Sequence, residues 1–297
     1  MNIVRQVFQR GLEIRMRDDG KWYFQSVANS GDPAPVDPAT ITHSFGVRPV
    51  LVTERLSNDA ERTYLLHADG VRLFGLELSG LKERGPAQCP WFYHAVDLTY
   101  VLGAVAYHCE RLAELYADVC RRFAWIARVA GLAEDFALFQ DLPGVWYEFD
   151  ALITAARRSY DSARYPLWRA FGNQKGSVPS SFEDALRLCQ RVPEGLRSRL
   201  EESRSKFYVR LTEYRDCIQH YIPLYFGLSS VHMERLQGGA WVMRALIPDN
   251  PETRSRAKFT YNCKTDALTF GWDVTNEVLD VALAIMDALP RNGEGQG

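Results

Sequence analysis

The stretch from residue 96 to residue 132 constrains the fold of this chain most strongly. It reads VDLTYVLGAVAYHCERLAELYADVCRRFAWIARVAGL, and its apolar residues recur at the spacing of a helix with one wide buried face. Gly131 stands where a helix C-cap is expected, because glycine readily adopts the left-handed conformation that ends many helices. This helix is expected to form part of a central bundle.

Further helices are predicted on the C-terminal side of this run. VWYEFDALITAARRSYDSARYPLWRAF (residues 145–171) carries a stripe of residues expected to be buried. The members of that stripe are Phe149, Leu152, Ile153, Ala156, Tyr160, Ala163 and Leu167. Ser181 is expected to cap a helix that begins FEDALRLCQRV, and Pro193 to open a short helix, PEGLRSRLEESR. Another helix is predicted from about residue 205 to residue 221.

The first ninety residues are typical of strands and turns. IRMRDDGKWYFQS places Asp-Gly between two β-friendly runs, which predicts a hairpin, whereas NSGDPAPVDPAT (residues 29–40) predicts a loop. VRPVLVTERL, RTYLLHADG and VRLFGLELSG predict three strands of an antiparallel meander.

The region after Pro223 is predicted to be mixed. AWVMRALIP, KFTYNC and ALTFGWD are interpreted as strands, and VTNEVLDVALAIMDAL as a final amphipathic helix capped by Thr275 or Asp273.

These patterns together predict the α+β class. We expect an antiparallel β region at residues 1–90 and a helical bundle at residues 95–225. We expect C-terminal strands plus a helix at residues 226–290, and these strands are candidates to complete the N-terminal sheet.

Composition excludes several broad classes of function. The 297 residues carry a formal charge of −2, so the whole chain has no strong field directed at nucleic acid or membrane. No uninterrupted apolar run approaches about 18 residues, and the N-terminal residues lack the apolar core of a signal peptide. The six cysteines show no CxxC pair and no regular framework, which favours reduced thiols in a cytoplasm.

One short motif dominates the functional interpretation. LTEYRDCIQHYI (residues 211–222) places Arg215, Asp216 and His220 in a helix that Pro223 must end. Ideal helix geometry separates Arg215 from His220 by about 140° around the axis. Distortion before the proline or approach of a second copy of the helix could bring the two side chains together.

These residue types suit RNA hydrolysis without a metal. Such a reaction needs a base for the 2′-hydroxyl, an acid for the leaving 5′-oxygen and positive charge on the phosphorane. Histidine suits the proton steps because its ordinary pKa lies near neutrality, and arginine can bind two phosphate oxygens together. Asp216 could orient either partner. Alternatively, the three residues form an ordinary solvated helix surface, where the helix dipole alone favours a C-terminal histidine.

RDCIQH, late in a bundle of four or five helices, resembles the Arg-x4–6-His motif of the HEPN superfamily, and residues 145–171 resemble a HEPN core helix. The resemblance implies an all-α bundle over roughly residues 95–225 that usually dimerises so that two motifs line one cleft. It implies a metal-independent endoribonuclease of a bacterial toxin–antitoxin or phage-defence system, with RNA as substrate. Arg215 and His220 would be the catalytic pair and Asp216 their supporting residue.

Additional residues are candidates for substrate contact. Arg204, Lys206 and Arg210 precede the motif and could bind phosphate, although nearby glutamates make a salt-bridged helix surface a competing interpretation. Glu148, Asp150 and Arg157 on the helix at residues 145–171 are candidates to support the catalytic pair, and Arg157 is also a candidate to bind the substrate. The adjacent His108 and Cys109, with Cys120, are interpreted as core residues rather than as a zinc site, since no second pair completes the ligands. No cofactor is expected.

Two functions therefore remain open. The first is a homodimeric endoribonuclease, with an antitoxin or a defence protein as its partner. The second is a non-catalytic HEPN-like interaction or sensor module that dimerises and binds a protein or nucleic acid. An Arg215 tied up within its own chain and a His220 facing solvent would favour the second.

Overall fold

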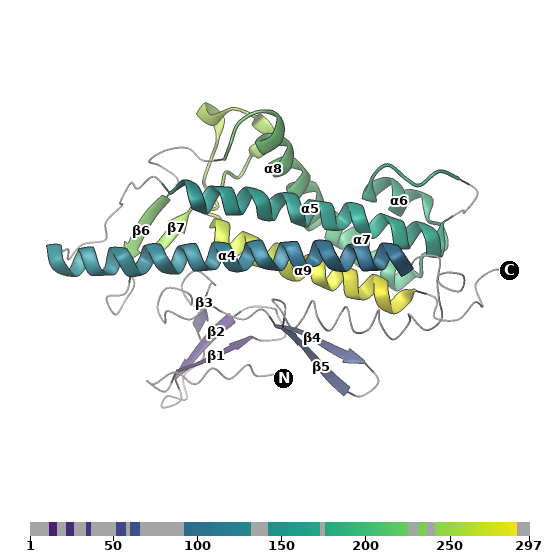
Figure 1. Cartoon of the computed structure of the whole chain (residues 1–297), viewed down its shortest axis with the longest axis horizontal. Helices are drawn as coiled ribbons and strands as arrows, with labels where there is room; N and C mark the ends of the chain where they lie inside the picture. Colours follow the sequence, from purple (N-terminus) through teal and green to yellow (C-terminus); the bar gives the residue numbers. More distant parts are fainter. Residues whose placement is uncertain are drawn as a thin grey trace.

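The computed structural model describes a mostly helical chain with short antiparallel strand pairs, in agreement with the predicted α+β class (Figure 1). Every structural statement below refers to the described residues, which are 12–16, 22–26, 34–36, 52–57, 60–65, 92–131, 142–172, 176–224, 231–235 and 241–289. None of the described helices is long and apolar enough to cross a membrane.

The helices and strands are as follows. The helices are α4 (Phe92–Ala130), α5 (Pro143–Phe171), α6 (Phe182–Leu188), α7 (Glu194–Ser203), the π-helical turn η3 (Arg204–Tyr208), α8 (Val209–His220), the short 3₁₀ turns η5 (Pro251–Thr253) and η6 (Arg256–Lys258), and α9 (Ala267–Ala288). The strands are β1 (Leu12–Met16), β2 (Trp22–Ser26), β3 (Ala34–Val36), β4 (Val52–Ser57), β5 (Ala60–Leu65), β6 (Val231–Arg235) and β7 (Trp241–Ala245).

The N-terminal strands form two separate antiparallel groups, β1-β2-β3 and β4-β5. The predicted hairpin is confirmed, with Ile14 of β1 opposite Phe24 of β2. The prediction of a loop at residues 29–40 is wrong for β3, which pairs with β2 and accommodates Pro35 because an edge strand tolerates proline. Strands β4 and β5 confirm two members of the predicted meander, and residues 71–80 lie outside the described residues.

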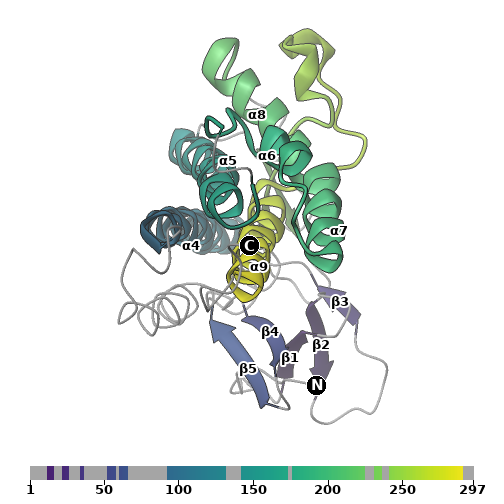
Figure 2. The same ribbon diagram turned by 90° about the vertical axis from the view of Figure 1, so that its right-hand side faces the viewer.

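The core of the molecule is the set of contacts among α4, α5 and α9. Helices α4 and α5 pack along each other, and α9 packs against both and against α7 (Figure 2). All seven residues of the stripe predicted on α5 are buried, which confirms its buried face. Gly131 has φ +65° directly after α4, as expected for a glycine that ends a helix.

Helices α7, η3 and α8 form one continuous helical run from Glu194 to His220. The two helices predicted in this part of the chain are therefore joined by a π-helical turn. Such turns insert one residue into a helix and occur often at functional sites. Ser181 caps α6 as predicted, because its side chain accepts a hydrogen bond from the Asp184 backbone N–H at 3.0 Å.

The C-terminal segment corrects three predictions. ALTFGWD is not a strand but the first two turns of α9, and KFTYNC forms no strand. Asp266, rather than Thr275 or Asp273, caps α9 by accepting from two backbone N–H groups of its first turn. Helix α9 is buried on most of its surface, so its first turns are nearly continuously apolar and resemble a buried strand.

Strands β6 and β7 pair with each other and with no other described strand. They therefore do not extend the N-terminal sheet within the described residues. Because α9 lies in the same core as α4 and α5, the bundle includes a helix well beyond residues 95–225. A single core explains this, since the apolar face of α9 needs the apolar faces of α4 and α5 to exclude water.

Gly271 of α9 lies close against Leu152 of α5. A Cβ atom at this position would lie 2.5 Å from Leu152 Cδ2, and Leu152 is fully buried. We expect Gly271→Ala to lower the free energy of unfolding by about 1–2 kcal/mol, since overpacking outweighs the helix propensity of alanine. Gly195→Ala on α7, where the added Cβ would meet no atom within 4 Å, should instead be neutral or stabilise by about 0.5 kcal/mol. Chemical denaturation measures the free energy of unfolding of both variants. Equal changes in the two variants would contradict the close contact between Gly271 and Leu152.

Candidate functional site

The candidate site is the C-terminal half of α8. The helix ends at His220, where the backbone N–H groups of Tyr221 and Ile222 both donate to the Cys217 carbonyl oxygen, at 3.1 and 2.9 Å. Pro223 follows, and proline cannot continue this ladder because it has no N–H. The motif therefore occupies the last two turns of α8, and Pro223 prevents the helix from continuing.

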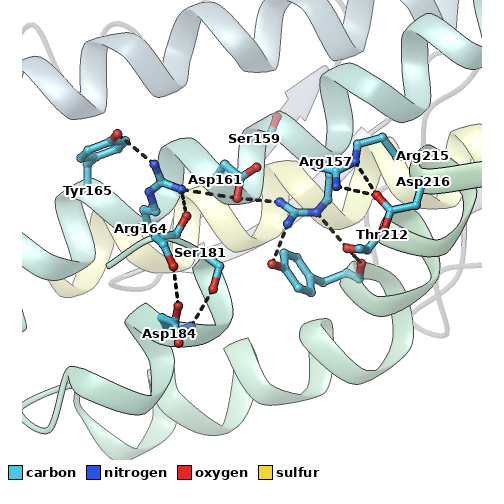
Figure 3. A network of polar contacts seen from close by, with 12 residues as sticks. Arg157, Ser159, Asp161, Arg164, Tyr165, Ser181, Asp184, Thr212, Arg215 and Asp216 are labelled. Carbon is cyan, nitrogen blue, oxygen red and sulfur yellow. Dashed lines mark hydrogen bonds and ion pairs between the residues drawn. The ribbon is translucent and has the colours of Figure 1, made fainter. Parts of the chain in front are cut away.

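Arg215 is bound to its neighbour Asp216. Its Nη2 and Nε atoms lie 2.6 and 3.1 Å from Asp216 Oδ1, and both side chains are half-buried (Figure 3). An ion pair at this level of exposure stabilises the fold by only about 0–1 kcal/mol. The pair thus orients the guanidinium without holding it strongly, and water reaches it.

His220 lies on the exposed last turn of α8. Its ring contacts the Tyr221 ring edge to face, with 6.3 Å between the centroids. No hydrogen bond or ion pair joins His220 to Arg215 in the part of the chain that the structure describes. Within one copy of α8, Arg215 is instead paired with Asp216 and His220 contacts Tyr221.

Arg157 of α5 is buried and its side chain joins α5 to α8. Its Nη2 donates to the Tyr208 hydroxyl at 2.7 Å, its Nε donates to Thr212 Oγ1 at 2.8 Å, and its Nη1 lies 2.6 Å from Asp161 Oδ1 (Figure 3). The guanidinium also lies over the Tyr208 ring, 4.1 Å from its centroid. With its donors directed at protein groups, Arg157 positions the turn of α8 that precedes Arg215.

The three basic residues predicted to bind phosphate near the motif each have a partner within the chain. Arg204 pairs with Glu183 of α6, and Lys206 pairs with Glu202 at 2.5 Å. Arg210 donates to the Tyr214 hydroxyl at 3.0 Å and lies over the Tyr214 ring. Arg204 and Lys206 therefore lie on a salt-bridged helix surface, the competing interpretation of the sequence, whereas Arg210 is bound to a tyrosine.

A residue that the sequence interpretation missed lies beside the motif. Arg254 Nη1 donates to the Tyr221 hydroxyl at 2.5 Å, and its guanidinium lies 4.2 Å from the centroid of the Tyr221 ring. The Tyr221 side chain, directly after the end of α8, is 50% exposed. The signal that could have revealed this contact is the cationic run in residues 251–264, which holds two arginines and two lysines against one glutamate.

Asp150 is an isolated carboxylate on α5. Its Oδ1 atom is enclosed and has no hydrogen-bond partner among the described residues. Burial raises the pKa of Asp150 to about 7. Nearby, burial also raises the pKa of the Cys217 thiol on α8, while Arg254 and Arg256 oppose that shift and Asp150 adds to it.

The raised pKa of Asp150 predicts a pH-dependent stability. An unfolded aspartate titrates near about 3.9, so the stability contributed by protonated Asp150 is full below about pH 4 and is lost as the pH rises through about 7. We expect Asp150→Asn to retain about 1–3 kcal/mol that the wild type loses across this window. Thermal unfolding from pH 4 to pH 8 measures it. Asp266 is present in both the wild type and Asp150→Asn, so its effect on the pH dependence is the same in both. Parallel curves of melting temperature against pH would therefore contradict the role of Asp150.

The remaining candidates have ordinary structural roles. His108 Nδ1 and Glu148 Oε2 lie 2.8 Å apart and join α4 to α5. Cys109 and Cys120 are buried, and burial raises the pKa of each thiol to about 12. Within the described ranges no group of three or more His, Cys, Asp or Glu side chains is arranged to hold a metal ion.

Comparisons with known proteins add no relatives. No protein-family model matches the sequence, and neither curated proteins nor solved structures give a match.

Proposed function

We propose that this protein is a metal-independent endoribonuclease of a bacterial toxin–antitoxin or phage-defence system, with a HEPN-like bundle that acts as a homodimer. The observation that supports the proposal is that solvent reaches the motif residues, whose types suit metal-free RNA cleavage, at the end of α8. Asp216 orients Arg215, and His220 stands free on the adjacent exposed turn. Both groups are thereby accessible to an RNA strand and to a second copy of the helix.

The proposed reaction divides the work between the two residues. The His220 imidazole takes the proton from the 2′-hydroxyl, or protonates the leaving 5′-oxygen, and the Arg215 guanidinium neutralises charge on the phosphorane. Attack of the 2′-oxygen on phosphorus forms one bond and breaks the bond to the 5′-oxygen, which leaves a 2′,3′-cyclic phosphate. Since Arg215 and His220 do not touch within one chain, a symmetric dimer would combine the arginine of one copy with the histidine of the other.

Induced expression of the wild type beside His220→Ala tests this proposal. We expect the wild type to arrest growth and to produce RNA fragments that end in 2′,3′-cyclic phosphate, and the variant to do neither. Purified wild type should cleave RNA in the presence of a chelator. Equal growth arrest and equal fragments from both proteins would contradict the proposal.

The second candidate is a non-catalytic module that dimerises and binds RNA or a protein partner. The pairing of Arg215 with Asp216 and the solvent-facing His220 favour it, because neither residue is held against the other in one chain. This candidate predicts intact RNA, no 2′,3′-cyclic ends and an unchanged phenotype for His220→Ala. For the endoribonuclease, we also propose an antitoxin or a defence protein as its partner and a location in the cytoplasm.

A further inference from the structure

A cationic segment from a different part of the chain lies against the end of α8. The turn η5 packs on α8, and Figure 1 shows the segment beside the end of α8, on the same side of the molecule. Residues 251–264 hold four cations and one carboxylate. Such an excess, placed beside the motif helix, is suited to an anionic partner.

The segment is held in place by its own hydrogen bonds. Asn250 accepts from the Thr260 N–H at 2.8 Å and donates to the Lys258 carbonyl oxygen at 3.0 Å. Asp249 accepts from the backbone N–H groups of Asn262 and Cys263 at 2.6 and 3.2 Å. These hydrogen bonds fix the backbone of the loop before a ligand binds, which lowers the conformational entropy lost on binding.

Two of these cations occupy strained backbone positions. Arg254 has φ 55° and Lys264 has φ 49°, and they are the non-glycine residues with positive φ in the described chain. A bulky side chain in the left-handed region costs about 1 kcal/mol or more, and such strain gathers at functional sites. Glycine would relieve the strain at either position, yet both positions carry a positive charge.

Arg254 extends the candidate site by a chain of contacts. Its guanidinium covers the Tyr221 ring, and the Tyr221 ring contacts the His220 ring. Tyr221 remains half-exposed, so the part of its ring that Arg254 leaves uncovered and the adjacent cation can both meet a nucleotide. Aromatic rings stack on bases and arginine binds phosphate, which is the combination that single-stranded RNA requires.

We infer that residues 251–264, with Arg254 on Tyr221 as their anchor, form a binding surface for single-stranded RNA that guides the strand to His220. This inference rests on the proposed function for the identity of the substrate. The surface lies outside the helical region that resembles HEPN, so it would determine which RNA reaches the motif. Arg254 would act as a binding residue and Tyr221 as its stacking partner.

The test measures binding of a fluorescent single-stranded RNA oligonucleotide to the full chain in the His220→Ala background. We expect Arg254→Gly to weaken binding about tenfold and to reduce the salt dependence by about one phosphate contact. Its melting temperature should change little, because relief of the positive φ offsets the lost contact with Tyr221. Arg187→Gln, which removes an exposed arginine of α6, is the matched control and should bind as the background does.

The outcomes separate this inference from the proposed function. Unchanged RNA affinity in Arg254→Gly would overturn the inference even if the wild type cleaves RNA. Affinity that depends on Arg254 without any cleavage by the wild type would support the surface and overturn the nuclease proposal. A large fall in melting temperature with unchanged salt dependence would show that Arg254 only ties the loop to α8. Absence of RNA binding in the background protein would overturn the inference.

Discussion

Replacement of His220 by alanine is expected to slow RNA cleavage by the purified protein about 10²- to 10⁴-fold, the usual contribution of a general acid or base. The side chain is exposed and its ring contacts the Tyr221 ring, so the melting temperature should stay within about 1–2 °C of the wild type. Gln219→Ala, on the same exposed turn, is the matched control and should retain its rate. Cleavage of a labelled RNA under single-turnover conditions measures the rate of the wild type and of both variants.

A mixing experiment determines whether the site is shared between two copies. Under the proposed mechanism, Arg215→Ala should be as inactive as His220→Ala, since it removes the charge proposed to face the phosphorane. The two variants are mixed in equal amounts and their subunits are exchanged by mild denaturation. If each site combines residues of two copies, the mixed dimers that form hold one intact site. About a quarter of the wild-type rate should then return. No recovery would show that each chain uses its own pair, and undiminished rates in both single variants would exclude the mechanism.

The helices could be predicted from the sequence because their signals are local. The buried stripe of α5, the Ser181 cap and the length of α4 all follow from periodicity and capping rules. The start of α9 could not be predicted, because a helix buried on most sides loses the polar face that reveals its period. The strand β3 was missed because proline, glycine and aspartate dominate its stretch, and only its pairing with β2 shows that Pro35 lies in an edge strand.

The candidate site was predictable only in part for a related reason. The order of Arg215, Asp216 and His220 along one helix is visible in the sequence, and the structure adds that Asp216 binds Arg215. The neighbours of the motif come from elsewhere in the chain. Arg157 lies about sixty residues before it and is bound to side chains of α5, η3 and α8. Arg254 lies beyond Pro223 and binds Tyr221. A sequence pattern cannot distinguish a buried arginine from an accessible one, because burial is a property of the assembled core.

Asp266 is the junction on which three elements of the core depend. Its Oδ1 atom accepts from the Tyr116 hydroxyl of α4 at 3.0 Å and from the Ala245 N–H of β7 at 2.9 Å. Its Oδ2 atom accepts from the N–H groups of Leu268 and Thr269, at 3.1 and 3.2 Å, in the first turn of α9. The side chain is buried, and burial raises its pKa to about 6 despite these donors. One carboxylate therefore satisfies donors from α4, β7 and α9.

We expect Asp266→Ala to lower the free energy of unfolding by about 3–5 kcal/mol, because it leaves buried N–H and hydroxyl groups without acceptors and removes the cap of α9. The melting temperature should fall by about 10 °C. Asp266→Asn should also destabilise, since its amide N–H₂ would face donors where the carboxylate accepts. Glu201→Ala on α7, whose exposed carboxylate lies 3.9 Å from Arg197, is the control and should change the free energy of unfolding by less than about 1 kcal/mol. The wild type should lose part of the contribution of Asp266 as the pH rises through about 6, since its folded pKa is raised, and Asp266→Ala should lack that slope. A loss below about 1 kcal/mol in Asp266→Ala would mean that α4, β7 and α9 hold together without this junction.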